Sequence, residues 1–354
     1  MEFIKPGINI DFIGKRKIAL TLSLAVILTT IILLIWRGGP NYGVDFSGGI
    51  LIQVKLEEKQ SPSDIRKALE AIQLQDSIIQ EFGEEGQFEY LIRVRSTEIQ
   101  LAGLDESVKQ ALISHFNKGA DIRRVEMVGP KVGKDLRQKA LFAIFYAILF
   151  IAIYISGRFE HQWLMSIIMA LSLALVVYIA SSAGISVTWL ILIALLVTLG
   201  LCWFLRLKYA MGAIIALIHD VTITVGAFAL TDREISLSII AAFLTIVGYS
   251  LNDTIVVFDR IRENLSRFRR RGFEEVMNAS INETLSRTIL TSTTTLIVVV
   301  ALFVLGGGVI HDFAFALLIG VIVGTYSSVF VASPILLVFQ GRFAEKPKIK
   351  KGSH

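Results

Sequence analysis

Six polar residues stand inside or at the edge of long apolar stretches, where they could carry protons or ions. The stretch "YAMGAIIALIHDVTITVGAFAL" contains His219 and Asp220, and "GYSLNDTIVVFDRIREN" contains Asn252, Asp253, Asp259 and Arg260. A charge at the centre of a bilayer costs about 2.5–3.5 kcal/mol, so such residues usually face the interior of a helix bundle and mark a functional pathway. We therefore predict an ion or proton role for Asp220. A structural hydrogen bond from a protonated Asp220 is the alternative.

Helical spacing groups the second set of polar residues. Asn252 and Asp259 are seven residues apart, as are Asp253 and Arg260, so each pair shares one helix face two turns apart. We expect both faces to point into the bundle, the first together with Thr245 and Gly248. Asp259 and Arg260 stand where the helix leaves the membrane, and an interfacial arginine also fits that place without any function.

Hydroxyl and small residues provide supporting patterns. Thr288, Ser292 and Thr295 share one face of "SRTILTSTTTLIVVV" and could bond across helices or line a hydrated path, although hydroxyls are common in membrane helices. Small and polar residues recur every four positions around Asp220, which permits close approach of another helix; they are Gly212, Ala216 and Thr224.

Composition places the chain in a membrane. Of 354 residues, 54% are hydrophobic and 18% are charged, which is more apolar than an ordinary soluble domain. A membrane helix needs about 20 mainly apolar residues, and we predict about eight. The predicted spans are residues 17–36, 137–156, 163–183, 186–205, 209–230, 235–257, 288–305 and 313–338. The single cysteine, Cys202, can form no disulfide within the chain.

Basic residues predict the orientation, because Lys and Arg accumulate in cytoplasmic connections. With both termini cytoplasmic, the inner ends collect Lys15, Arg16, Lys17, Arg158, Arg206, Lys208, the basic run from 260 to 271 and the lysines after 345. Among the short outer loops only Arg233 is basic. This distribution matches topology better than a nucleic-acid surface, so we expect no nucleic-acid partner. No motif predicts a metal or a cofactor.

The first two spans enclose one soluble domain, residues 37–135, which we expect on the extracytoplasmic side. Its periodicity changes in the order βαββαβ, the ferredoxin-like split motif. The expected strands and helices are "SGGILIQVKL", "SPSDIRKALEAI", "SIIQEF", "FEYLIRVRS", "DESVKQALISHFN" and "ADIRRVEMVGP". Glycine-rich pieces at both borders lack phosphate-loop spacing, so we interpret them as hinges; they contain Gly48, Gly49, Gly129 and Gly133.

The domain boundaries follow from these segments. Residues 1–36 hold an interfacial segment and an uncleaved first anchor, residues 136–340 hold seven further spans, and residues 341–354 form a basic cytoplasmic tail. The basic, amphipathic segment 261–287 is predicted to lie along the cytoplasmic interface and to contact membrane lipids.

Several motifs together resemble the SecF family of protein-export subunits in the resistance-nodulation-division superfamily. They are "IDFIGKRKIAL", "VDFSGG", "GPKVGKDLRQKA", "ALIHDVTIT" and "VGYSLNDTIVVFDRIREN". The resemblance implies a subunit of the bacterial inner membrane, without enzymatic activity, that uses the proton motive force in late steps of preprotein export. It also implies a SecD-like subunit, the SecYEG channel and unfolded preproteins as partners, and protons as the coupling ion.

The resemblance assigns the proton relay to Asp220, Asn252, Asp253, Asp259 and Arg260, with His219, Thr288, Ser292 and Thr295 as possible support. We expect Asp220 to accept the proton and either Arg260 or Asp253 to be its charged partner.

The chain departs from its family in one region, because a typical family member has six spans. Residues 163–205 form an extra apolar hairpin without a charged residue, and an inserted pair of spans preserves the orientation of everything downstream. The extra hairpin puts the usual SecD docking surface in doubt.

Three other functions compete with this prediction. A proton-coupled solute or lipid exporter of the same superfamily would usually have two large extracytoplasmic domains and a duplicated membrane half. An intramembrane aspartyl protease would need Asp220 and Asp253 to share a proton. A scaffold independent of protons would leave the buried charges unexplained.

Overall fold

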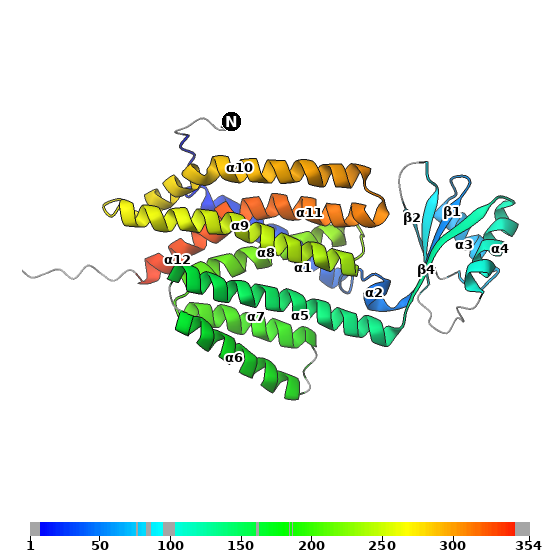
Figure 1. Cartoon of the computed structure of the whole chain (residues 1–354), viewed down its shortest axis with the longest axis horizontal. Coiled ribbons are helices and arrows are strands. Elements are labelled where there is room, and N and C mark those ends of the chain that lie inside the picture. Colours follow the sequence, from blue (N-terminus) through cyan, green and yellow to red (C-terminus); the bar gives the residue numbers. More distant parts are fainter. Residues whose placement is uncertain are drawn as a thin grey trace, which may run out of the picture.

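The computed structural model describes residues 8–75, 77–82, 86–94, 103–160, 163–183, 185 and 187–343. It has two parts (Figure 1). Long helices that run roughly side by side form one part, and a small α/β domain stands at one end of them. The predicted basic tail lies largely outside the described residues, which end at 343.

Six helical segments of the described chain are long and apolar enough to cross a membrane. They lie within Arg16–Trp36, Pro130–Glu160, Lys208–Leu230, Leu237–Arg267, Phe273–Leu305 and Ile310–Phe339. The corresponding elements are α1 (Arg16–Trp36), α5 (Pro130–Ile155) with the π-helical turn η1 (Ser156–Glu160), α8 (Lys208–Leu230), α9 (Leu237–Arg267), α10 (Phe273–Leu305), and α11 (Gly308–Ser327), which continues through the π-helical turn η2 (Ser328–Ala332) into α12 (Ser333–Phe343).

The extra hairpin forms two helices, α6 (Trp163–Ser182) and α7 (Val187–Phe204), which pack on each other and on α5. They lie at the periphery of the bundle (Figure 1). Their apolar stretches, Trp163–Ile179 and Trp189–Phe204, are shorter than the six other candidates. Six spans are therefore supported directly, and the two further spans of the hairpin stay a prediction.

The segment 261–287 has a different arrangement from the one expected. Helix α9 continues to Arg267, and α10 begins at Phe273, so the segment is divided between the ends of two long helices. Asn264 on α9 joins them, because its amide nitrogen donates to Ser280 Oγ at 3.0 Å and to Glu283 Oε2 at 2.9 Å on α10. Local amphipathicity could not distinguish one interfacial helix from two helix ends that bury their apolar sides against each other.

The soluble domain has the predicted element order. A short helix α2 (Val44–Ser47) leads into β1 (Gly49–Leu56), α3 (Pro62–Glu70), β2 (Ile78–Phe82), β3 (Glu89–Val94), α4 (Leu104–Phe116) and β4 (Ala120–Val128). The four strands pair antiparallel in the order β2-β3-β1-β4. Helix α3 begins at a serine cap, since Ser61 Oγ accepts from the Asp64 amide, and the Ser61 hydroxyl also lowers the pKa of the Asp64 carboxyl.

Alternation along the strands gives the sheet two different faces. Ile50, Ile52 and Val54 of β1 are fully buried and pack with residues of α3 and α4. The intervening residues Leu51 and Gln53 face the other way, toward the ends of the membrane helices. The sheet thus has one apolar face under its own helices and one more polar face over the bundle.

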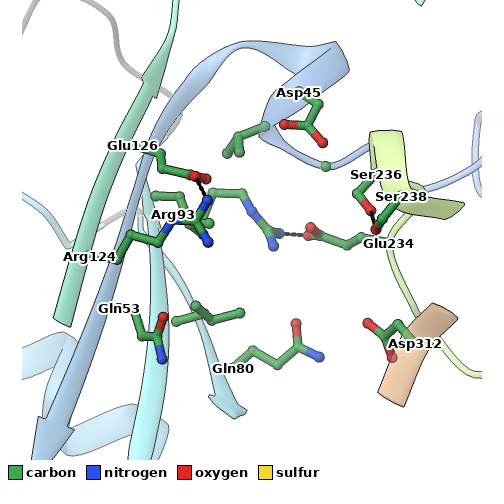
Figure 2. Close-up of a pocket in the computed structure, with 14 residues that line it drawn as sticks. Asp45, Gln53, Gln80, Arg93, Arg124, Glu126, Glu234, Ser236, Ser238 and Asp312 are labelled. Carbon is green, nitrogen blue, oxygen red and sulfur yellow. Dashed lines mark hydrogen bonds and ion pairs between the residues drawn. The ribbon is translucent and has the colours of Figure 1, made fainter. Parts of the chain in front are cut away.

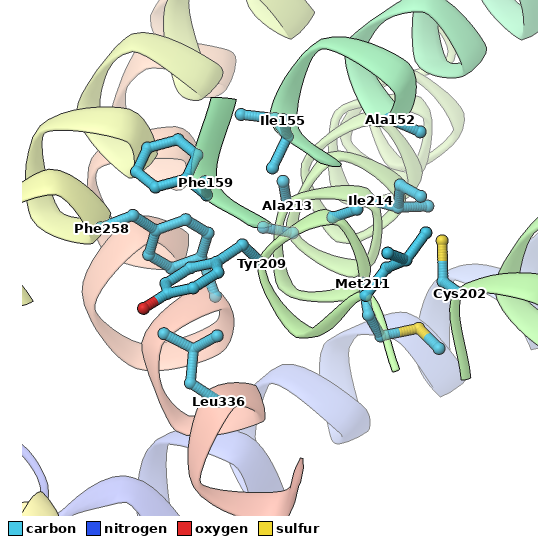
Figure 3. Close-up of a cluster of buried hydrophobic side chains, with 14 of the residues drawn as sticks. Ala152, Ile155, Phe159, Cys202, Tyr209, Met211, Ala213, Ile214, Phe258 and Leu336 are labelled. Carbon is cyan, nitrogen blue, oxygen red and sulfur yellow. The ribbon is translucent and has the colours of Figure 1, made fainter. Parts of the chain in front are cut away.

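The cores of the two parts do not share a residue among those described. In the bundle, Phe159, Tyr209 and Phe258 stack around one point, with ring centroids 5.2–5.9 Å apart (Figure 3). Burying an aromatic or branched side chain of this size contributes about 1.5–3 kcal/mol. Each part therefore has its own source of stability.

The glycines at the border are packed in different ways. Gly48 has φ +74°, and a Cβ there would lie 3.0 Å from Pro130 Cα; a Cβ at Gly133 would lie 3.0 Å from the Phe46 carbonyl oxygen. A Cβ at Gly129, in contrast, would meet nothing within 4 Å. Gly48 and Gly133 thus allow α2 to pack against the start of α5. The hinge role of Gly48, Gly49, Gly129 and Gly133 stays a prediction.

Candidate functional site

Asp220 lies in the middle of α8 and has no exposed surface. Its Oδ1 lies 2.8 Å from His219 Nδ1. Its Oδ2 accepts two hydrogen bonds, from Ser327 Oγ at 2.8 Å on α11 and from Ser250 Oγ at 2.5 Å on α9. Three helices therefore meet at one carboxyl group, and both of its oxygens are satisfied, as a buried polar group requires.

A chain of hydrogen bonds extends from this carboxyl to α1 and fixes where protons can be. Tyr326 Oη donates its proton to the Ala19 carbonyl oxygen at 2.7 Å. In its contact with Ser23 Oγ at 3.0 Å, Tyr326 Oη is therefore the acceptor and Ser23 the donor. Ser23 has then used its proton, so it accepts from His219 Nε2 at 3.0 Å. A single proton is left for the contact between His219 Nδ1 and Asp220 Oδ1.

The charge of the His219–Asp220 pair follows from this arrangement. The shared proton belongs either to an imidazolium beside a carboxylate or to a carboxylic acid beside a neutral imidazole. In both cases the pair has no net charge, which suits a site in low dielectric. Adding or removing one proton would leave a net charge in the middle of the bundle, and the surrounding hydroxyls would have to reorient or move.

Asp253 is a second buried carboxyl, 3% exposed, and faces α10 and α11. Ser292 Oγ lies 3.5 Å from its Oδ2, and the same hydroxyl lies 2.7 Å from Thr325 Oγ1. Of the three predicted supporting hydroxyls, Ser292 thus reaches a relay carboxyl. Thr288 is buried with no hydrogen bond from its hydroxyl, and Thr295 donates to the Thr291 carbonyl of its own helix.

The structure separates Asp220 from its expected charged partners. No hydrogen bond or ion pair found in the described part of the chain joins Asp220 to Asp253 or Arg260. Arg260 instead contacts Glu263 at 3.2 Å and Glu283 at 3.6 Å. Spacing along one helix places residues on a face, but it does not determine which neighbouring helix that face contacts.

The outer residues of the predicted relay lie at the surface. Asp259 pairs with Arg158 at 2.7 Å, and both side chains are partly exposed. Asn252 is exposed and lines a groove of about 410 Å³ together with Asp259 and Arg260. The prediction that the face of Asn252 points into the bundle is wrong for this chain, because α9 turns the side of Ser250 and Asp253 toward its neighbours.

Four residues of the site were missed in the sequence: Ser23, Ser250, Tyr326 and Ser327. Ser250 stands within the quoted "GYSLND" and lies one helical turn from the predicted relay, so spacing offered a weak signal for it. Ser23, Tyr326 and Ser327 come from helices at the two ends of the chain, and isolated hydroxyls in apolar helices are too common to indicate a site.

The fold and the buried carboxyls define a membrane protein of the type that transports or exports. A family model described as "Protein export membrane protein SecD/SecF, C-terminal" matches residues 108–203 and 185–342, and a "SecD/SecF GG Motif" model matches residues 34–60. The two matched ranges of the first model overlap at residues 185–203, within the extra hairpin.

Curated relatives give the more particular assignment. A protein translocase subunit SecF from Magnetococcus marinus is 40% identical over 347 residues, which cover 96% of this chain and 94% of the relative. The SecF subunit of Rickettsia prowazekii is 34% identical and covers 99% and 98%. This chain belongs to the SecF family of protein translocase subunits.

A solved structure agrees with this assignment. The crystal structure of SecDF, a translocon-associated membrane protein from Thermus thermophilus, is 30% identical with a TM-score of 0.69 and matches 95% of this chain. The match covers 39% of that longer chain, so this chain spans about two fifths of the SecDF protein it resembles.

Proposed function

We propose that this chain uses the proton motive force at the His219–Asp220 pair to drive late steps of preprotein export across the bacterial cytoplasmic membrane. The observation that supports this most is a fully buried carboxyl that lies 2.8 Å from a histidine nitrogen and is held by hydroxyls of α9 and α11. A change in its proton occupancy changes the net charge at the meeting point of three helices. Such a change favours a different helix arrangement.

The partners proposed for the chain follow from its size and family. It spans about two fifths of the SecDF protein, so a SecD-like subunit would supply a second membrane half. The SecYEG channel, an unfolded preprotein and membrane lipids complete the proposed assembly. Both termini would be cytoplasmic and the α/β domain extracytoplasmic, as the distribution of basic residues predicts.

Asp259, Arg260 and Asn252 fit a different part of this mechanism from Asp220. They line the groove on α9 and α10 with Glu263, Glu283 and Arg287, so their hydrogen-bonding groups are accessible from outside the chain. We propose that they act at the cytoplasmic end of the proton route, while Asp220 and Asp253 act inside the bundle.

The geometry disfavours the protease alternative. Two catalytic carboxyls would have to share a proton with each other. Asp220 is hydrogen-bonded to His219 and Asp253 to Ser292, and no hydrogen bond in the described part of the chain joins the two carboxyls. The other alternative, a proton-coupled exporter, would use the same proton site but would transport a solute or lipid and not a preprotein.

The proposed function is tested in membrane vesicles that contain the complete translocase. Dissipating the proton gradient with an ionophore after ATP-dependent export has begun is expected to slow completion to the rate of vesicles that lack this chain. Equal completion rates with and without the gradient would refute proton coupling. Purification in mild detergent should recover a SecD-like subunit with the chain, whereas transport of a small solute without any effect on preproteins would favour the exporter.

A substitution of Ser250 tests the site itself. Ser250→Ala removes one of the two donors to Asp220 Oδ2, and a hydrogen bond to a charged group is worth about 1.5–3 kcal/mol. We expect gradient-driven export to fall several-fold while the amount of chain in the membrane stays unchanged. Thr245→Ala on the exposed side of α9 is the matched control and should have no effect. Equal activities of the two variants would contradict the assigned contact.

A further inference from the structure

Three consecutive charged residues in the loop between α8 and α9 each pair with a different element. Asp232 accepts from Arg37, just after α1, at 2.5 Å. Arg233 pairs with Asp312 on α11, and Glu234 pairs with Arg93 on β3 of the soluble domain. The loop thus connects the helix that carries Asp220 with two other membrane helices and with the soluble domain.

The three ion pairs differ in their exposure to water. Asp232 is 73% exposed, so its pair with Arg37 contributes little. The side chains of Arg93 and Glu234 are 8% and 13% exposed. Removing one partner from such a pair leaves a poorly hydrated charge, so the other partner depends on it. Of these three pairs, the one between Arg93 and Glu234 joins the soluble domain to the helix bundle.

The surroundings of this pair are polar and roomy. Arg93 and Glu234 point at each other across a cavity of about 270 Å³ between the sheet and the bundle (Figure 2). The cavity is lined mainly by polar side chains, among them Asp45, Gln53, Gln80, Ser238 and Asp312. Water can therefore hydrate both charges once they separate, which makes this contact reversible.

The other attachment of the domain has the opposite character. There Gly48 and Gly133 bring α2 and the start of α5 into backbone contact, and Phe46 belongs to the core of the bundle. The domain is thus held by a tightly packed base on one side and by a reversible ion pair on the other. Opening of the ion pair would let the sheet tilt about its base.

We infer that Arg93 and Glu234 form a positioning pair that couples the proton site to the soluble domain and opens during the export cycle. The inference rests on the proposed function. The second half of α8 connects Asp220 to the loop, while Asp312 on α11 holds the loop through Arg233. A shift among these helices therefore moves Glu234 relative to Arg93 and releases the domain.

A reversible cross-link tests whether the pair must open. The variant combines Arg93→Cys and Glu234→Cys with Cys202→Ala. A bis-methanethiosulfonate reagent then joins the two new cysteines through a spacer that matches the length of the two side chains removed. Within the complete translocase in vesicles, the untreated double-cysteine variant should keep a reduced difference between export with and without a proton gradient, because it lacks the charge pair. We expect the cross-link to abolish this remaining difference and a reductant to restore it to the level of the untreated variant. Single-cysteine variants treated with the same reagent are the controls. Gradient-driven export at the full rate while the link is intact would overturn the inference.

A charge substitution provides a second measurement. Glu234→Gln keeps the shape of the side chain but removes its charge, and we expect it to lower the ratio of export with the gradient to export without it at least several-fold. Export without the gradient should not change. A folding defect, in contrast, would lower export both with and without the gradient. Asp232→Asn, at the exposed pair, should leave the ratio unchanged. An unchanged ratio in Glu234→Gln would overturn the inference.

The same vesicles distinguish failure of this inference from failure of the proposed function. If wild-type export does not respond to the gradient, the proposed function and the inference both fall. If wild-type export responds and the cross-linked variant responds equally, only the coupling role of Arg93 and Glu234 falls.

Discussion

Replacing Asp220 with asparagine is expected to abolish gradient-driven export, with a loss of more than about 100-fold, the lower end of what a positioned proton-transfer group contributes. Asparagine has nearly the same shape, and its amide oxygen can still accept from Ser250 and Ser327. It cannot take up or release the proton shared with His219. The variant therefore separates proton exchange from packing.

The measurement compares preprotein completion rates in vesicles with and without a proton gradient. Asp64→Asn, at a half-exposed carboxyl in the soluble domain, controls for the loss of an acidic residue and should export as the wild type does. The amount of Asp220→Asn chain in the membrane should match the wild type, because the buried hydrogen bonds to the two serines remain. Full gradient-driven export by this variant would eliminate Asp220 as the proton acceptor and leave Asp253 as the other buried carboxyl of the predicted relay.

Gly48→Ala should be the most damaging of the substitutions at the border between the two parts. Gly48 combines φ +74° with ψ 166°, a conformation almost restricted to glycine, and its missing Cβ faces Pro130 and the Val128 carbonyl at 3.0–3.2 Å. Backbone strain of this kind costs about 1–3 kcal/mol, and the crowded contact adds to it. We expect a large fall in both thermal stability and export.

Gly129→Ala is the matched control, because it lies in the facing turn with an ordinary φ of −67° and open space around it. It should retain wild-type stability and export. If the border acted only as a flexible hinge, both glycines would be needed for mobility and both substitutions would impair export equally. Melting temperature in detergent and export in vesicles together distinguish the packing role from the hinge role.

The comparison of Asp220 with Asn252 explains how far the sequence predicts the site. Asp220 is expensive to bury in an apolar helix, so its burial against polar partners could be predicted from its position alone. Asn252 costs less free energy than a charged residue to place in a membrane, so its position alone does not require buried partners. It lies on an exposed face of α9, and its predicted inward orientation was wrong. The cost of a residue in the membrane indicates that it needs partners, but it does not identify the helix that supplies them.

The soluble domain was more predictable than the membrane site. Strand β1 alternates between buried and less buried residues, and α3 begins at the capping serine Ser61, so both elements are encoded locally. The segment 261–287 has an equally clear local pattern, which did not reveal that it consists of the ends of two long helices; its place at the cytoplasmic interface stays a prediction. A period of 3.6 residues is the same in both arrangements, and only the contact through Asn264 distinguishes them.

The sequence by itself determined that this is a membrane protein of the SecF family with one βαββαβ domain and a buried aspartate, because apolar runs, alternation and motifs are local properties of the chain. Only the tertiary structure decided that Ser23, Ser250 and Ser327 complete the site around His219 and Asp220, and that Glu234 reaches Arg93 in the soluble domain. These contacts join residues far apart in the chain. Their partners depend on how whole helices pack, which no local pattern specifies.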